Sequence, residues 1–297
     1  MSNKFLLSVF VLLFLISVNG NSQWVKISDD MKGGGAFRSL ASIDNNILAG
    51  TFLKGVVLSK NSGDNWSNTS LNSGTIWAMA VSGSNVFAGT SSKGEFMGVF
   101  VSTNSGSNWT KTALNNHYVY ALSGNGTNVY AGTPEGVFFS KDNGITWNES
   151  TLKNVCVNSI VMNGSNIYAG TNTGIYISND NGAIWKLSGL SDQTVWAVAV
   201  NGNYIFAGTW HAGVNISTDN GQTWSPTSSG GDYIRSLIIN NNVIYAGSEE
   251  KGIFSSTDNG SSWTQMSLND QSVLSFAANG NSIYAGTSMG IYIYTIK

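Results

Sequence analysis

The chain repeats one unit of sequence seven times, and this repetition limits its fold more than any other feature. Each unit contains a tryptophan that closes a turn and, further on, a glycine inside an Ala-Gly-Thr or Ala-Gly-Ser step. The tryptophans are Trp24, Trp66, Trp109, Trp147, Trp185, Trp224 and Trp263. The glycines are Gly50, Gly89, Gly132, Gly170, Gly208, Gly247 and Gly286. The glycine follows its tryptophan by 23 residues in six units, so the units are nearly identical in length.

Each unit reads as four short strands. In the second unit these are residues 76–82, 85–90, 98–103 and 108–113, which are rich in Val, Ile, Phe and Trp and are separated by Gly, Asn and Ser. This pattern is typical of β-strands with tight turns, and no 3.6-residue helical period competes with it. The tryptophans recur every 38 to 43 residues, which is the period of four-stranded propeller blades. The sequence therefore predicts an all-β, seven-bladed β-propeller of antiparallel blades.

The two ends of the repeat array predict how the ring closes. The first unit begins at Trp24 with only a fourth strand, "QWVKIS", and the last unit stops after a third strand, "GIYIYTI". We expect the N-terminal strand to complete the last blade, because this pairing leaves no long strand edge exposed. Residues 21–297 are thus expected to form a single propeller domain.

The first twenty residues resemble a secretory signal. Lys4 precedes an apolar run from Phe5 to Val18, and small residues follow at the position that a signal peptidase reads. The alternative is a buried N-terminal helix. We expect residues 1–20 to be a signal peptide and the mature protein to be secreted, periplasmic or extracellular, with no integral membrane segment after cleavage. Net charge is −2 and only 10% of residues are charged, so no nucleic-acid partner is expected.

A turn motif of the form S-x-D-x-G-x-[TS]-W precedes most of the tryptophans. Its third position holds Asn61, Asn104, Asp142, Asp180, Asp219 and Asp258. Such a side chain can accept backbone N–H groups of its own turn, and the glycine supplies a positive φ. Calcium needs six to eight oxygen ligands, whereas each turn brings one carboxylate. A catalytic carboxylate would not recur around a ring. We therefore interpret these residues as structural and expect no metal and no cofactor.

This motif resembles the Asp-box (BNR) repeat, and the resemblance covers residues 23–297. The N-terminal unit keeps only its tryptophan. Propellers of this kind include sialidases, xyloglucan-degrading glycosidases, sortilin-type receptors and the photosystem II assembly propeller. The resemblance implies the fold more directly than it implies an activity.

A candidate binding site lies on the face opposite the Asp boxes, where the loops between strands 2 and 3 and between strands 4 and 1 emerge. Two of these loops, at 91–98 and 29–35, are longer than their counterparts, as binding-face loops of repeat proteins often are. The position twelve residues before each repeat glycine is variable and holds the only two arginines of the chain. It reads Arg38, Trp77, Tyr120, Asn158, Trp196, Arg235 and Leu274. With Trp210 and His211 from a facing loop, these side chains could stack on sugars and bind carboxylates.

Three readings of this face are open. A sialidase resemblance would imply three arginines and a Tyr nucleophile, and xyloglucan-degrading relatives would imply two tandem propellers; neither fits this chain. A glycan-processing enzyme could still use Glu135, Glu249 or Glu250 with His211. An adhesion or assembly scaffold would need no pocket, and the aromatic residues would then simply pack between blades. We favour a non-enzymatic, monomeric propeller that binds a glycan or an extracytoplasmic protein, without catalytic residues. The single Cys156 is expected to be a buried, inert thiol.

Overall fold

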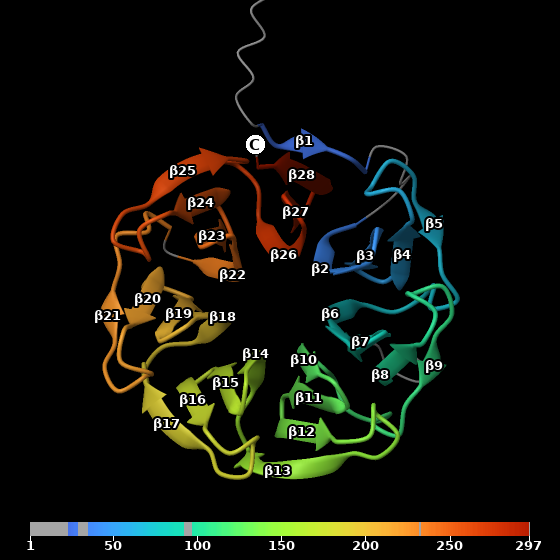
Figure 1. The fold of residues 1–297 in the computed structure, drawn as a ribbon, viewed down its shortest axis with the longest axis horizontal. Coiled ribbons are helices and arrows are strands. Elements are labelled where there is room, and N and C mark those ends of the chain that lie inside the picture. Colours follow the sequence, from blue (N-terminus) through green and yellow to red (C-terminus); the bar gives the residue numbers. More distant parts are fainter. Residues whose placement is uncertain (1–22, 29–34, 92–96, 232, 297) are drawn as a thin grey trace, which may run out of the picture.

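The computed structural model describes residues 23–28, 35–91, 97–231 and 233–296. The expected signal peptide at 1–20 lies outside the described residues, as does most of the two long loops. Within the described part of the chain, seven four-stranded antiparallel sheets are arranged radially around one axis (Figure 1). The predicted seven-bladed propeller is therefore confirmed. Among the described residues no helix is long and apolar enough to span a membrane.

The strands run outward in chain order within each of the first six blades. From the inner to the outer strand, the first blade consists of β2 (Phe37–Ile43), β3 (Asn46–Thr51), β4 (Val56–Ser59) and β5 (Ser67–Asn68), and the second of β6 (Ile76–Ser82), β7 (Asn85–Ser91), β8 (Met97–Ser102) and β9 (Thr110–Lys111). The third blade consists of β10 (Ala121–Asn125), β11 (Asn128–Thr133), β12 (Gly136–Ser140) and β13 (Asn148–Lys153), and the fourth of β14 (Val157–Asn163), β15 (Asn166–Thr171), β16 (Gly174–Ser178) and β17 (Lys186–Gly189). The fifth blade consists of β18 (Val195–Asn201), β19 (Tyr204–Thr209), β20 (Val214–Ser217) and β21 (Ser225–Pro226), and the sixth of β22 (Ile234–Asn240), β23 (Val243–Ser248), β24 (Ile253–Ser256) and β25 (Thr264–Ser267).

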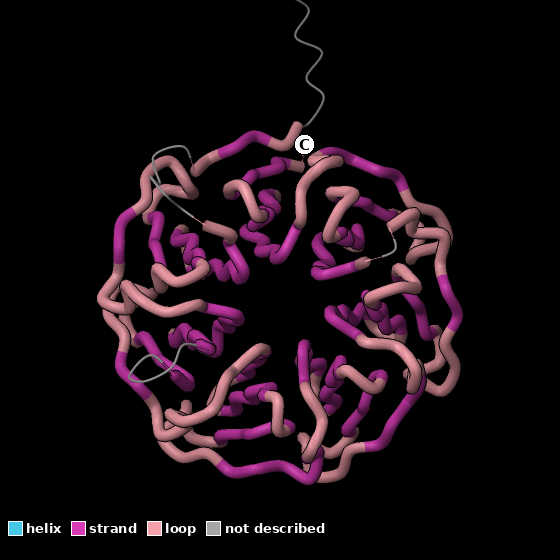
Figure 2. The backbone as a smooth tube through the Cα atoms, turned by 180° about the vertical axis from the view of Figure 1, so that it is seen from behind, coloured by secondary structure: helices cyan, strands magenta, loops and turns pink. Residues whose placement is uncertain are grey.

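The seventh blade is built from both ends of the repeat array. It consists of β26 (Val273–Asn279), β27 (Ser282–Thr287), β28 (Ile291–Thr295) and, as its outer strand, β1 (Val25–Lys26). In the register of this pair, Val25 lies opposite Ile293, and the Ile27 N–H donates to the Ile291 carbonyl at 2.9 Å. The tube view from behind shows the ring closed at this blade (Figure 2). The expected closure by the N-terminal strand is thus confirmed.

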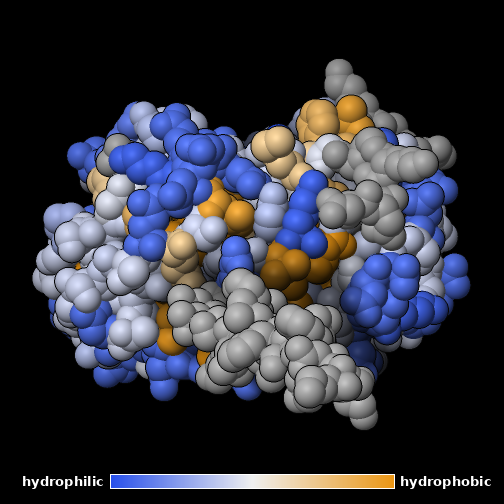
Figure 3. Space-filling model, turned by 90° about the horizontal axis from the view of Figure 1, so that it is seen from above, coloured by the Kyte–Doolittle hydropathy of each residue, from blue (hydrophilic) through white to orange (hydrophobic). Residues whose placement is uncertain are grey.

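The hydrophobic core lies between neighbouring blades, and the repeat glycine explains how closely they pack. A Cβ added at Gly208 would lie 2.6 Å from Ile234 Cγ2 on the next blade, and one at Gly170 would lie 2.8 Å from Val195 Cγ1. Real carbon atoms do not approach so closely, so the Ala-Gly step is required for an apolar side chain of the adjacent inner strand to fit. The outer wall seen from above is mostly hydrophilic at its left and right, with hydrophobic patches near its middle (Figure 3).

The Asp boxes connect the third strand of a blade to the fourth, as predicted, and each is a self-contained turn. In the box of the third blade, Asp142 Oδ1 accepts the Thr146 N–H at 2.8 Å and the Ser140 hydroxyl at 2.7 Å. The Ser140 Oγ accepts the Gly144 N–H at 2.8 Å, where φ is +82°. The tryptophan that closes the box is half-buried against the core between blades. The structural interpretation of the motif accounts for all these contacts.

Asparagine preserves the turn in the two divergent boxes. Asn61 Oδ1 accepts the Asn65 N–H at 3.0 Å and the Ser59 hydroxyl at 2.9 Å. Asn104 Oδ1 accepts the Asn108 N–H at 2.8 Å in the same way. An amide oxygen therefore replaces the carboxylate oxygen that the turn uses, and the charge of the aspartate is not required for it.

Acid is expected to destabilise the propeller through these carboxylates. Hydrogen bonds from the hydroxyls of Thr146, Thr223 and Ser262, joined by backbone N–H groups, lower the pKa values of Asp142, Asp219 and Asp258 from 3.8 to about 2. Because these pKa values are lower in the folded state, the stabilisation is complete above about pH 4 and is lost as the pH falls through about 2. The free energy of unfolding, measured by urea titration across this window, should therefore decrease with falling pH.

The two natural Asn boxes suggest the control for this measurement. The triple substitution Asp142→Asn, Asp219→Asn and Asp258→Asn should fold and should show a shallower loss of stability between about pH 4 and 2. An unchanged slope in the triple variant would show that other carboxylates cause the acid sensitivity.

Candidate functional site

A pocket opens where the inner strands begin, on the face opposite the Asp boxes. Its volume is about 280 Å³. It is lined by Arg38, Trp77, Tyr120, Cys156, Asn158, Trp196, Arg235 and Leu274. We call this the central pocket. The seven residues of the variable sequence position all lie in it, one from each blade.

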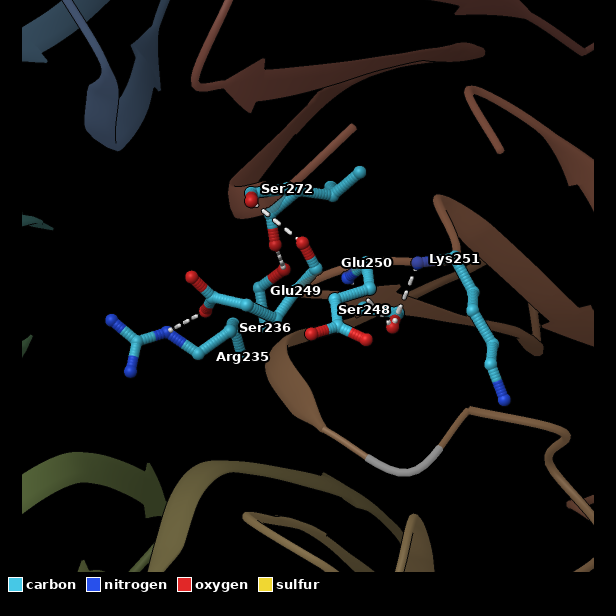
Figure 4. A network of polar contacts seen from close by, with 8 residues as sticks. Arg235, Ser236, Ser248, Glu249, Glu250, Lys251 and Ser272 are labelled. Carbon is cyan, nitrogen blue, oxygen red and sulfur yellow. Dashed lines mark hydrogen bonds and ion pairs between the residues drawn. The ribbon is translucent and has the colours of Figure 1, made fainter. Parts of the chain in front are cut away.

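Arg235 is held between an aromatic ring and a carboxylate. Its Cζ lies 4.1 Å from the centroid of the Trp196 ring, and its Nε lies 2.9 Å from Glu249 Oε2. The close-up shows the Glu249 side chain turned toward Arg235, while Lys251 points away (Figure 4). This is an ion pair without regular hydrogen-bond angles, since the buried Glu249 Oε2 has no hydrogen-bond partner among the described residues. The Arg235 side chain is 14% exposed, and burial lowers its pKa, against the opposing effect of Glu249.

Arg38 has an aromatic neighbour but no ion pair among the described residues. Its Cζ lies 4.3 Å from the centroid of the Trp77 ring and 5.3 Å from that of Phe52. Its Nε is buried and, within the described part of the chain, has no hydrogen-bond partner. Burial, and then the positive charge of Arg235, lower the pKa of Arg38, while Glu249 raises it. Arg38 thus lies against two aromatic rings and does not extend freely into solvent.

The central pocket has an excess of positive charge. Among the described residues only one of the two guanidinium groups has a carboxylate partner, Glu249 beside Arg235. Both arginines retain their charge at neutral pH because guanidinium pKa values lie far above 7. A buried N–H without a partner is costly, so an acceptor that reaches this group would be favoured. The pocket can therefore receive an anionic group beside flat aromatic surfaces.

The far wall of the central pocket is neutral. The Trp77 and Tyr120 rings meet edge to face at 5.5 Å, and Asn158 Nδ2 donates to the Val195 carbonyl at 3.2 Å. The Cys156 thiol is directed to Asn158 Oδ1 at 3.6 Å. Burial raises the pKa of both Tyr120 and Cys156. The expectation for Cys156 needs correction, because the thiol is only partly buried and lines the pocket, although its raised pKa keeps it protonated and weakly nucleophilic.

Trp210 and His211 do not line the central pocket, although the sequence grouped them with it. The Trp210 ring lies 5.9 Å from the Trp196 ring and 5.0 Å from the Tyr233 ring. His211 packs on Tyr233 at 5.1 Å. Together these residues form an aromatic cluster beside the pocket residue Trp196.

Cys156 and Tyr233 were missed as site residues, yet a signal for both exists. Each stands fourteen residues before a repeat glycine, two positions ahead of the variable position. Both residues lie immediately before an inner strand, β14 or β22, next to the irregularity in strand register at Asn158 and Arg235, so the two positions lie together at the start of the strand. Reading both positions together would have found them.

The three glutamates of the enzyme alternative are not brought together. Glu135, between β11 and β12 in the third blade, pairs with His117 at 3.3 Å. Glu249, between β23 and β24 in the sixth blade, pairs with Arg235. Glu250 is exposed. Among the described residues no group of three or more His, Cys, Asp or Glu side chains is placed to hold a metal ion.

The repeat itself matches a known family. The profile of the BNR/Asp-box repeat matches residues 138–149 and 216–226, the turns of the third and fifth blades. The chain is a seven-bladed propeller with BNR/Asp-box repeats. No curated protein sequence matches this propeller. Its function must therefore be argued from its own residues.

Solved structures share the ring of this Asp-box propeller at low sequence identity. Ycf48 from Cyanidioschyzon merolae is 12% identical with a TM-score of 0.72, over 92% of this chain and 98% of that one. A putative hybrid two-component system from B. thetaiotaomicron (extracellular domain) is 15% identical with a TM-score of 0.76, over 92% and 40%. The GH74 xyloglucanase from Xanthomonas campestris is 16% identical with a TM-score of 0.72, over 92% and 53%. At these identities the likeness concerns the fold.

Proposed function

We propose that this chain is a non-enzymatic binding propeller whose central pocket receives a carboxylate group carried by a glycan or a peptide. The observation that supports the proposal is the pair of arginines, each stacked on a tryptophan, of which only Arg235 has a carboxylate partner among the described residues. Guanidinium groups recognise carboxylates through paired N–H donors. The adjacent indole rings offer a flat surface on which a sugar ring or an aromatic side chain can stack.

Propellers of the same fold support a binding role. A second Ycf48 structure is described as bound to D1 peptide; it is 10% identical to this chain with a TM-score of 0.74. The similar structure from B. thetaiotaomicron is the extracellular domain of a putative hybrid two-component system. We extend this to propose that the protein acts outside the cytoplasm as a single chain, in keeping with the signal-like residues 1–20.

A catalytic role has less support. The xyloglucanase shares the fold, but here Glu135 and Glu249 belong to the third and sixth blades and each is paired with a basic side chain. Glycoside hydrolysis requires two carboxyl groups within about 10 Å on either side of one bond. A scaffold that uses a broad surface would leave the central pocket without a role.

The proposal is tested by binding to a panel of uronate oligosaccharides, neutral oligosaccharides and peptides with free or amidated C-termini. The parent protein is compared with Arg38→Ala and Trp196→Ala, and with Lys251→Ala as a control that removes a positive charge outside the pocket. We expect a carboxylate probe to bind and both pocket variants to weaken it at least about tenfold, or about 1.4 kcal/mol. Circular dichroism and thermal melting verify folding.

Each result decides between the readings. If Lys251→Ala binds the probe as tightly as the parent while the pocket variants lose affinity, the loss is specific to the pocket and not caused by a change in net charge. Unchanged binding by the pocket variants, or no binding to any carboxylate probe, would refute the proposal and favour the scaffold. Cleavage of a bound glycan would establish the enzyme.

A further inference from the structure

A second groove lies on the Asp-box face, between the fifth and sixth blades. Two cavities of about 480 and 580 Å³ meet there and share Tyr204 and Asn259 as wall residues. One is bounded by the turn 201–204 and by Asn242. The other is bounded by Pro226, on the outer strand β21, and by the Asp box at 258–261. Because both hollows have Tyr204 and Asn259 as walls, they lie on either side of these two residues, and we call the pair, from the turns of the inner strands to the outer strand, the groove.

Tyr204 distinguishes this groove from the equivalent positions in the other blades. The residue four positions before the repeat glycine reads Asn46, Asn85, Asn128, Asn166, Tyr204, Val243 and Ser282. Tyr204 is exposed (36%), whereas the other six side chains are partly buried. Every other blade forms with a smaller side chain at this position, so the fold does not require the large ring of Tyr204. An exposed aromatic ring offers a flat apolar surface on which a ligand can stack.

The walls of the groove are mostly polar and carry a single charge, that of Asp258. Its lining includes no lysine or arginine. Its one carboxylate, Asp258, is engaged by the N–H and hydroxyl of Ser262 within its own turn. The amides of Asn201, Asn242 and Asn259 and the Thr257 hydroxyl can donate and accept hydrogen bonds. The Thr227 hydroxyl already donates to the Val214 carbonyl at 2.8 Å and can therefore only accept. This chemistry differs from the cationic central pocket on the other face.

We infer that the groove binds a neutral oligosaccharide or polysaccharide chain, with a sugar ring stacked on Tyr204. A pyranose ring presents an apolar C–H face to an aromatic ring and hydroxyl groups at its edge. Neighbouring amides and hydroxyls are suited to those edges, and a chain of several sugars fits a groove that extends past both sides of one ring. The two faces of the propeller then bind different ligands, an anionic one in the central pocket and a neutral sugar here.

The test uses cellohexaose, xylohexaose and mannohexaose as probes in calorimetric and saturation-transfer NMR titrations. The key variant is Tyr204→Asn, which restores the residue found in four other blades and should therefore fold. We expect at least one hexasaccharide to bind the parent protein and Tyr204→Asn to weaken it about tenfold or more. Arg38→Ala should bind the same probe with parental affinity.

Three outcomes would overturn the inference. The parent protein could bind none of the three probes. Tyr204→Asn could bind as tightly as the parent. Arg38→Ala could lose the probe as well, which would place the neutral sugar in the central pocket. Because the central-pocket proposal is read from carboxylate probes, failure here leaves that proposal standing.

Discussion

Exchanging Arg235 for glutamate is expected to weaken binding of the carboxylate probe by more than about 100-fold, or about 2.7 kcal/mol. The substitution removes the cation that stacks on Trp196 at 4.1 Å and places a second carboxylate beside Glu249. Two neighbouring carboxylates repel an anionic ligand and one another. Calorimetric titration of the probe identified in the panel measures the effect, with melting curves to confirm that the variant is folded.

The matched substitution Glu249→Gln should act in the opposite direction. It keeps the shape of the side chain but removes the negative charge that lies 2.9 Å from Arg235 Nε. We expect the carboxylate probe to bind several-fold more tightly and its affinity to fall more steeply with added salt, because the pocket becomes more positive. If Arg235→Glu retains affinity within a few-fold of the parent, the arginines have a structural role only.

The largest loss of stability is expected for Trp24→Ala. Trp24 is 7% exposed and packs with Tyr245, Ile253 and Val273 between the sixth and seventh blades. Replacing a buried tryptophan with alanine typically costs about 3–5 kcal/mol. Here the cost falls on β1, whose two paired residues hold little other buried surface. Urea unfolding followed by circular dichroism measures the free energy of unfolding.

Trp210→Ala is the control for this experiment. Trp210 is 37% exposed and lies in a loop, so its removal should lower the free energy of unfolding by less than Trp24→Ala does. If both variants lose the same free energy of unfolding, Trp24 stabilises the ring no more than a partly exposed loop tryptophan does.

The fold could be predicted almost completely because its determinants are local and repeated. The glycine of the Ala-Gly step and the Asx residue of each box act within one blade or between neighbours. A position that varies between uniform neighbours, such as the one occupied by Arg38 and Trp196, indicates residues that the fold does not require. The same reasoning applied to every position would also have found Tyr204.

The contacts among site residues could not be predicted. The ion pair joins Arg235 on β22 to Glu249 in the loop after β23, and the edge-to-face contact of Trp210 with Tyr233 joins residues outside the strands. His211 was assigned to the pocket from its position in the chain, whereas its ring packs on Tyr233 beside it. Side-chain direction in irregular loops depends on tertiary packing, which a repeat pattern does not encode.

The closing pair of strands also dictates an order of assembly. Strand β1 precedes all the other strands of the ring in the sequence, and its partner β28 lies more than 260 residues later. Six blades can each form from one continuous segment, whereas the seventh must wait until the whole repeat array exists. Contacts between distant segments form slowly because the entropy of closing the chain must be overcome first. Until that step, the edge of β28 is unpaired and the apolar surface that contacts Trp24 is exposed to solvent. The chain is therefore most prone to aggregation in the interval before the ring closes.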